Sequence, residues 1–320
     1  MRFAAIDIGT NTVLLLVAEE RALPPRPASG AAPQGEPEWV PVVERAEITR
    51  LGRGVDRSGR LDPAAIRDTV EVLARFAGEA RALGARSIAC VATSAARDAA
   101  NGAAFFDAAR EAAGLVPEVI SGDEEARLVW ASAWRDFGDA GSLAVLDVGG
   151  GSTEVCLGAG PLPRARRSLQ IGAVRLTERV APPDPPGAIA LAALRHGAAE
   201  ALEPAAALAG AGARPARLVG VAGTVTTLAA VERALPLYDA NVVHGAELSL
   251  AAAEALYARL GALTTAERAR LRGMEPKRAD VIVAGCAIVL EAMRLLGFDR
   301  LTVSDRGVRW GLLYDRFGHG

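Results

Sequence analysis

Four short turns made of glycine, serine and threonine each follow an apolar, strand-like segment of this chain. They span residues 9–12, 149–153, 223–224 and 304–307. Glycine permits positive φ angles and close backbone approach, so that backbone N–H groups and hydroxyls can donate to phosphate oxygens. A single turn of this kind is usually an ordinary turn, whereas four of them favour a phosphate-binding site. No Gly-Lys-Ser/Thr sequence follows any of the four, which excludes a Walker loop.

The first two turns belong to a repeated segment. Residues 5–16 read AIDIGTNTVLLL and residues 144–157 read AVLDVGGGSTEVCL. When one copy is shifted by 140 positions, Asp7 aligns with Asp147, Gly9 with Gly149, and Thr12 with Ser152. The shared aspartate, glycine and hydroxyl favour an internal duplication over chance similarity. Two similar lobes would form a cleft, and ligands commonly bind in clefts.

Acidic residues accompany both copies of the repeat. Asp7 and Asp147 stand at strand ends inside apolar runs, where each is either a turn-capping residue or a carboxylate that needs a partner. If they face each other across a cleft, they suit Mg²⁺ or another divalent cation, which binds carboxylates, water and phosphate oxygens. Glu154 lies close enough to the second turn to join them, unless it faces outward from its strand.

The segment SGDEEARL contains a candidate general base. Ser121 or Asp123 is a predicted helix N-cap, and Glu124 and Glu125 fall in the first helical turn. Capping and complementation of the helix dipole explain Glu124, and the position of this helix start makes one glutamate a candidate general base. Hydrolysis of a phosphoanhydride needs a positioned water, a base, and cations on the phosphate oxygens. Arg97, which follows an apolar strand, is either such a cation or a surface arginine.

The elements that position these residues alternate between strands and helices, which predicts an α/β fold with a mixed sheet. Residues 24–37 are rich in proline, glycine and alanine and predict an extended loop. Expected strands lie at 3–8 and 12–18, from 39, and at 87–93, 117–121, 144–148, 153–157, 217–223 and 301–304. Expected helices lie at 63–83, near 105, from 121, and at 189–208, 224–235, 250–263, 279–296 and 308–317.

Composition excludes several classes of protein. The formal net charge of −2 argues against a general nucleic-acid binder, which would carry a basic excess. Cys90, Cys156 and Cys286 are scattered singly in apolar runs and predict buried free thiols in a reducing compartment. The three histidines are isolated, which argues against a zinc site. No signal peptide or bilayer-spanning segment is evident, so we expect a cytoplasmic protein without membrane partners.

These motifs resemble the exopolyphosphatase / guanosine pentaphosphate phosphatase family, which lies in the superfamily of acetate kinase, sugar kinases, heat-shock ATPases and actin. The matching segments follow the family order over almost the whole chain. They are AAIDIGTNTVLLLVAE, VATSAARDA, EVISGDEEARL, VLDVGGGSTEV, GVAGTVTTLAA, His244-Gly245, RADVIVAG and VSDRGVRWGLL.

The resemblance implies two actin-like (ribonuclease-H-like) lobes with the active site in the cleft between them. We expect the first lobe at 1–124 and the second at 125–305, with the final helix, 306–320, packing back on the first. Glu125 matches the base that activates water, and Asp147 and Glu154 match acidic residues tied to Mg²⁺ and catalysis. Phosphate-binding residues implied by the match are Thr10, Asn11, Arg97, Gly149, Gly150, Gly151, Ser152, Gly223 and Thr224.

Family members release terminal phosphate from inorganic polyphosphate, or the 5′ γ-phosphate of guanosine pentaphosphate. The chain resembles the short, two-domain members, which favours shorter polyphosphate, and dimers common in the family imply a homodimer. Trp310 stands where the family usually has a glutamate, although Arg309 is kept. Exopolyphosphatase is the leading hypothesis and guanosine pentaphosphate phosphatase the runner-up. A kinase of the same superfamily and a non-catalytic binder of polyphosphate or alarmone nucleotides are alternatives from other classes.

Overall fold

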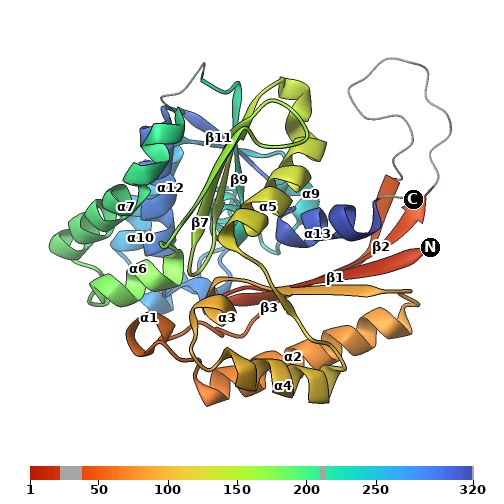
Figure 1. The fold of residues 1–320 in the computed structure, drawn as a ribbon. Helices are drawn as coiled ribbons and strands as arrows, with labels where there is room; N and C mark the ends of the chain where they lie inside the picture. The colour runs from red at the N-terminus through yellow and green to blue at the C-terminus, as the bar shows by residue number, and fades with distance from the viewer. Residues whose placement is uncertain (22–37, 210–213, 319–320) are drawn as a thin grey trace. The chain divides into compact units, whose positions relative to one another are not determined.

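The computed structural model describes residues 1–21, 38–209 and 214–318, and the chain divides into two compact units (Figure 1). The first unit is Met1–Asp139 with Val308–Gly320, and the second is Ala140–Gly307. The expected boundary after residue 124 is therefore displaced to residue 139, because α5 (Gly122–Phe137) packs against α13 (Val308–Phe317) within the first unit. The loop predicted at 24–37 lies outside the described residues.

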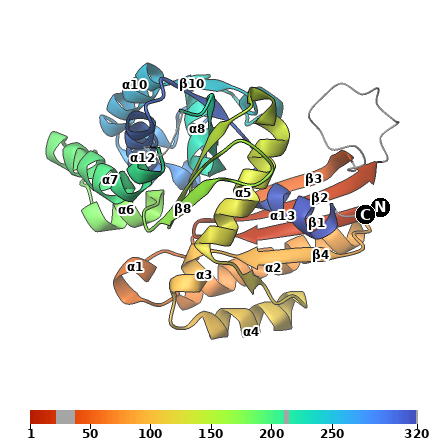
Figure 2. The same cartoon turned by 45° about the horizontal axis from the view of Figure 1, so that its top comes forward.

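The first unit is a five-stranded sheet in the order β3-β2-β1-β4-β5, covered by helices (Figure 2). The first three strands are antiparallel, whereas β1, β4 and β5 are parallel. The helices α2 and α4 cover one face, and α13 packs on the other. The strands are β1 (Arg2–Ile8), β2 (Thr12–Arg21), β3 (Glu38–Ile48), β4 (Ile88–Ala92) and β5 (Glu118–Val119). Its other helices are α1 (Val55–Ser58), α2 (Pro63–Ala82), α3 (Ser94–Asp98) and α4 (Gly102–Ala113).

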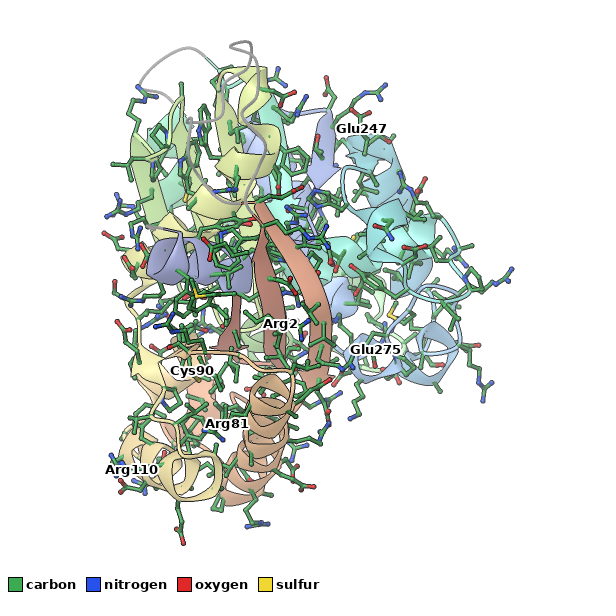
Figure 3. All side chains as sticks on the ribbon, turned by 90° about the vertical axis from the view of Figure 1, so that its right-hand side faces the viewer. Arg2, Arg81, Cys90, Arg110, Glu247 and Glu275 are labelled. Carbon is green, nitrogen blue, oxygen red and sulfur yellow. The ribbon has the colours of Figure 1, made fainter. Side chains whose placement is uncertain are left out.

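Local sequence explains why α2 begins where it does and how it packs. The Asp62 carboxylate accepts from the backbone N–H of Ala64 (Oδ1–N 2.7 Å), and Pro63 occupies the first helical turn, where its missing N–H costs nothing. Apolar residues such as Phe76 recur on one face and are buried against β1 and β2. At the far end Arg81, labelled in Figure 3, donates to the carbonyl of Ala113 (Nη2–O 2.8 Å) and ties α2 to α4.

The second unit is a six-stranded mixed sheet in the order β10-β11-β9-β6-β7-β8. Its large apolar core packs the helices α7, α8, α10 and α12 against one face of the sheet. The strands are β6 (Leu143–Val148), β7 (Thr153–Gly158), β8 (Ala165–Leu169), β9 (Arg217–Val221), β10 (Glu247–Ser249) and β11 (Arg300–Val303). The helices are α6 (Ala173–Val180), α7 (Ala188–Ala209), α8 (Ala222–Glu232), α9 (Ala240–Val243), α10 (Leu250–Gly261), α11 (Thr265–Arg268) and α12 (Ile282–Leu296).

The two sheets repeat one topology, which supports the internal duplication. In each, an antiparallel three-strand meander (β1-β2-β3 or β6-β7-β8) is extended by parallel strands beside its first member. The tight turns are also equivalent, because the N–H of Gly9 donates to Thr12 O and the N–H of Gly149 donates to Ser152 O. Five elements of the second unit, β8, α6, α9, β10 and α11, were not anticipated from the sequence.

All three cysteines are free thiols, although only two are buried. Cys156 and Cys286 lie in the second unit's interior, as expected, whereas Cys90 is half-buried. The physical reason is the shortness of β5, which pairs only with Val91 and Ala92 of β4 and leaves Cys90 uncovered on that side. In the described part of the chain, no helix combines the length and apolar character needed to cross a bilayer.

Candidate active site

Each unit gathers its polar turns at one edge of its sheet, where its parallel strands end. In the first unit, the turn 9–12 follows β1, α3 with Arg97 follows β4, and α5 with Glu125 follows β5. In the second unit, the turns 149–152, 223–224 and 304–307 follow β6, β9 and β11. The carboxyl ends of parallel strands are where α/β sheets commonly bind ligands.

In the turn 9–12 the carbonyl groups of Thr10 and Asn11 already accept hydrogen bonds, so the turn offers N–H groups to a ligand. Asn11 O accepts from the N–H groups of Thr49 and Arg50, both at 3.1 Å, and Thr10 O accepts from Gly52 N–H at 2.8 Å. In the described part of the chain, the N–H groups and side chains of Thr10 and Asn11 have no hydrogen-bond partner. Gly52 must be glycine for this contact, since a Cβ there would lie 2.3 Å from the Thr10 Cγ2.

The two adjacent glutamates at the start of α5 have different surroundings. Ser121 caps the helix by accepting from Glu124 N–H (Oγ–N 3.1 Å), as predicted. The Glu124 carboxylate pairs with Arg127 through both oxygens, with Oε1–Nη2 at 2.7 Å and Oε2–Nε at 2.9 Å. Glu125, in contrast, is 7% exposed and faces Arg97, with Oε2–Nη1 at 3.5 Å. The structure thus brings together the predicted base and the predicted phosphate cation.

Arg97 is held in place and still retains a donor. Its Nη1 donates to the Ile120 carbonyl at 2.9 Å, and its Nε lies 3.7 Å from the Asp98 Oδ1. The buried Nη2 has no hydrogen-bond partner among the described residues. A fixed guanidinium with a spare donor is suited to a phosphate oxygen.

The second unit's glycine turn has the same arrangement, with α6 as its partner. The N–H groups of Ala173 and Val174 donate to the carbonyls of Gly149 and Gly150, both at 2.9 Å. Arg175 Nε donates to the Gly151 carbonyl at 2.7 Å. In the described chain, the N–H groups of Gly150 and Gly151 have no hydrogen-bond partner, so the turn offers donors and no acceptors. Backbone amides arranged in this way bind anions.

Asp147 and Glu154 form a pair of buried carboxylates. They lie directly opposite each other in the β6–β7 ladder, where Cβ atoms are about 4.5–5.5 Å apart. Asp147 is 6% exposed and Glu154 only 1% exposed, so Glu154 does not face solvent from its strand. Burial raises the pKa of the Asp147 carboxyl to about 7. Carboxylate oxygens are the ligands that a hard divalent cation prefers, and such a cation would neutralise the charge of two buried carboxylates this close together.

A cation missed by sequence reasoning lies against the turn 223–224. The Arg278 guanidinium packs so closely on Gly223 that a Cβ there would lie 1.7 Å from the Arg278 Nη1. Desolvation lowers the pKa of Arg278, against the opposite influence of Glu275 and Tyr238. Gly223 and the buried Thr224 begin α8, whose N-terminus has no side-chain cap. Arg278 opens the RADVIVAG motif, which was the only signal of its importance.

The remaining predicted residues occupy defined places in the first unit. Asp7 is buried one residue before the end of β1. Desolvation raises the pKa of the neighbouring Cys90 thiol, and the Asp7 carboxylate raises it further. Trp310 is fully buried in α13 and packs against Tyr314, so it serves the core. Arg309 next to it pairs with Glu44. Within residues 1–21, 38–209 and 214–318, no group of three or more acidic, histidine or cysteine side chains is arranged to hold a metal ion.

Comparison with known proteins decides the family. Residues 33–319 match the Ppx/GppA phosphatase family. The chain belongs to this family. Exopolyphosphatase 2 of Mycobacterium tuberculosis, a relative, is 40% identical to it over 322 aligned residues, covering 97% of both chains.

Solved structures of the Ppx/GppA family agree with the fold described above. The Aquifex aeolicus PPX-GPPA enzyme superposes with a TM-score of 0.78 at 33% identity and covers 99% of both chains. An exopolyphosphatase from Cytophaga hutchinsonii superposes with a TM-score of 0.85 at 25% identity, over 98% of this chain and 97% of that one. The expected α/β fold with mixed sheets is confirmed.

Proposed function

We propose that this chain is an exopolyphosphatase, which hydrolyses the terminal phosphoanhydride bond of inorganic polyphosphate. The observation that carries the proposal is the buried Asp147–Glu154 pair next to a turn whose backbone offers only donors. Such a site is built for an anion that arrives with a divalent cation. The family membership and the activity named for the Mycobacterium tuberculosis relative point the same way.

Residue roles follow from the surroundings of each group. Glu125 accepts a proton from water, and the resulting hydroxide oxygen forms a bond to the terminal phosphorus. The bond from that phosphorus to the bridging oxygen breaks, which releases orthophosphate and a chain one phosphate shorter. Arg97 and Arg278 neutralise phosphate oxygens. The turns around Thr10, Asn11, Gly149–Ser152, Gly223 and Thr224 hold those oxygens through N–H groups and hydroxyls.

A divalent cation, which we propose to be Mg²⁺, fits the acidic pair. Asp147 and Glu154 of the second unit would hold it, and the role of Asp7 as a further ligand stays a prediction from the sequence. Mg²⁺ is commonly bound by one or two carboxylates, with water and substrate phosphate filling the other positions, so a pair of carboxylates is sufficient. When bound, the cation supplies charge neutralisation on the phosphate oxygens. A homodimer, a cytoplasmic location and a preference for short chains stay predictions.

The test is phosphate release, with Mg²⁺, from short polyphosphate, long polyphosphate and guanosine pentaphosphate in parallel. We expect the fastest release from polyphosphate. The Glu125→Gln variant should fold normally, bind the chain, and lose at least about 100-fold in kcat, because it lacks the base. Glu124→Gln is the matched control. The Glu124 carboxylate pairs with Arg127 and should be dispensable for turnover.

Each alternative has its own outcome in this experiment. Faster release from the nucleotide would identify a guanosine pentaphosphate phosphatase, and transfer of phosphate to an acceptor would identify a kinase. Binding without release from any substrate would identify a non-catalytic binder. An unchanged rate in Glu125→Gln would remove Glu125 from the mechanism.

A further inference from the structure

The strand β8 places a hydroxyl beside the acidic pair. It is the edge strand next to β7, and its register sets Ser168 directly opposite Glu154, which itself lies opposite Asp147. Residues directly opposite in neighbouring strands project to the same face of a sheet. Asp147, Glu154 and Ser168 therefore form one row across three strands, on the face away from the apolar core of α7 and α12.

The contact within this row is a short, charge-assisted hydrogen bond. Ser168 Oγ donates to Glu154 Oε1 at 2.7 Å. Glu154 is almost fully buried, and a glutamate side chain has three torsions to fix. A hydrogen bond to one carboxylate oxygen restricts the rotation of the whole group.

We propose that Ser168 is a positioning residue for Glu154, which sets the orientation of this carboxylate toward the divalent cation. This rests on the proposed function, in which Glu154 helps to hold that cation. In this role Ser168 acts through Glu154, to which its hydroxyl donates. Residues that orient metal-holding carboxylates typically affect cation affinity or activity by about 10–100-fold when they are removed. A purely structural serine would affect stability alone.

The test compares Ser168→Ala with Ser168→Thr, which keeps a hydroxyl and is well tolerated in a strand. Mn²⁺ binding to the substrate-free protein is measured by calorimetry, and kcat and KM by phosphate release from polyphosphate. We expect Ser168→Ala to weaken Mn²⁺ binding and to lower kcat by about 10-fold each with little change in KM, and Ser168→Thr to restore most of both.

The matched control is Ser249→Ala in the same unit. Ser249 caps α10 by accepting from Ala252 N–H (Oγ–N 3.1 Å), so its loss should lower the unfolding temperature and leave Mn²⁺ binding and kcat unchanged. Wild-type Mn²⁺ affinity and kcat in Ser168→Ala would overturn the proposal, as would losses that Ser249→Ala reproduces. If the wild type releases no phosphate, the proposed function fails, and the Mn²⁺ measurement still decides the role of Ser168.

Discussion

Among single residues, Asp147 shows most clearly the electrostatic cost of burying a carboxylate. Its carboxyl is buried opposite another buried carboxylate, and burial raises its pKa from the ordinary 3.8 to about 7. The folded protein therefore holds a proton that the unfolded chain releases near pH 4. It follows that this group's contribution to stability is present below pH 4 and is lost as pH rises through 7.

This sign gives a prediction for the cation-free protein. Asp147→Asn has no proton to lose, so in chelator it should be more stable than wild type at pH 8, by on the order of 4 kcal/mol, with little difference at pH 4. Urea unfolding at both pH values measures the difference, and added Mg²⁺ should stabilise only the wild type at pH 8. A difference that is equal at the two pH values would contradict the burial argument.

Arg278 shows how far single residues could be predicted from the sequence. The turns and their neighbours, such as Thr10 and Asn11, were visible because strand, glycine and hydroxyl follow one another along the chain. Arg278 meets Gly223 only through the packing of two segments that are distant in sequence. The spacing of residues along the sequence does not predict such a contact, which becomes apparent only when the fold is known.

At the scale of elements, α6 shapes the glycine turn of the second unit. Gly172, just before α6, approaches the turn so closely that a Cβ would lie 2.4 Å from both C and O of Gly150. The φ of Gly172, −157°, is open to any residue, so this contact and not backbone strain requires glycine. The donors of Gly150 and Gly151 depend on this approach, because the helix occupies their carbonyls.

Gly172→Ala should therefore displace the turn. We expect a loss of about 1–3 kcal/mol in the free energy of unfolding from overpacking, and a drop in kcat of at least about 10-fold, because misplaced donors no longer meet the phosphate. Phosphate release and urea unfolding measure the two effects. Gly187→Ala is the control, since nothing lies within 4 Å of its Cβ position. A Gly172→Ala protein with normal kcat would show that the turn does not bind phosphate.

The elements that sequence patterns missed are those with weak patterns. The strand β8 (ARRSL) is an edge strand with exposed Arg166 and Arg167, so it lacks the apolar run of a buried strand. The buried strands β1 and β6 are nearly continuous apolar runs, and the helix α2 has apolar residues at helical spacing. All three were predicted from these patterns. Ser168 was not predicted as a site residue because the strand that carries it, β8, was not predicted.

For the whole molecule, the duplication was predictable and the boundary between the units was not. The repeat of Asp7 and Asp147 at equivalent strand ends anticipated two related sheets. The expected boundary after residue 124 falls inside α5 and leaves most of this helix with the second unit. Its packing partner α13 follows after the entire second unit, and no local pattern links elements so far apart.

The last helix of the chain, α13, thus completes the packing of the first unit. The stability of that unit should therefore depend on how α13 fits against α5. α13 meets α5 at Gly311, where a Cβ would lie 1.9 Å from the Leu128 carbonyl oxygen. That oxygen is backbone and cannot move without shifting α5. Gly311→Ala should therefore lower the free energy of unfolding of the first unit by about 3 kcal/mol or more.

The tryptophans make this effect measurable in one unit alone. Trp39, Trp130, Trp134 and Trp310 are the four tryptophans of the chain, and all belong to the first unit. Their fluorescence during urea unfolding reports that unit, while far-UV circular dichroism reports both. In Gly311→Ala the fluorescence midpoint should fall, whereas exposed Gly78→Ala, in α2 with nothing within 4 Å of its Cβ position, should raise it slightly by helix propensity. An unchanged fluorescence midpoint in Gly311→Ala would mean that α13 does not close the first unit.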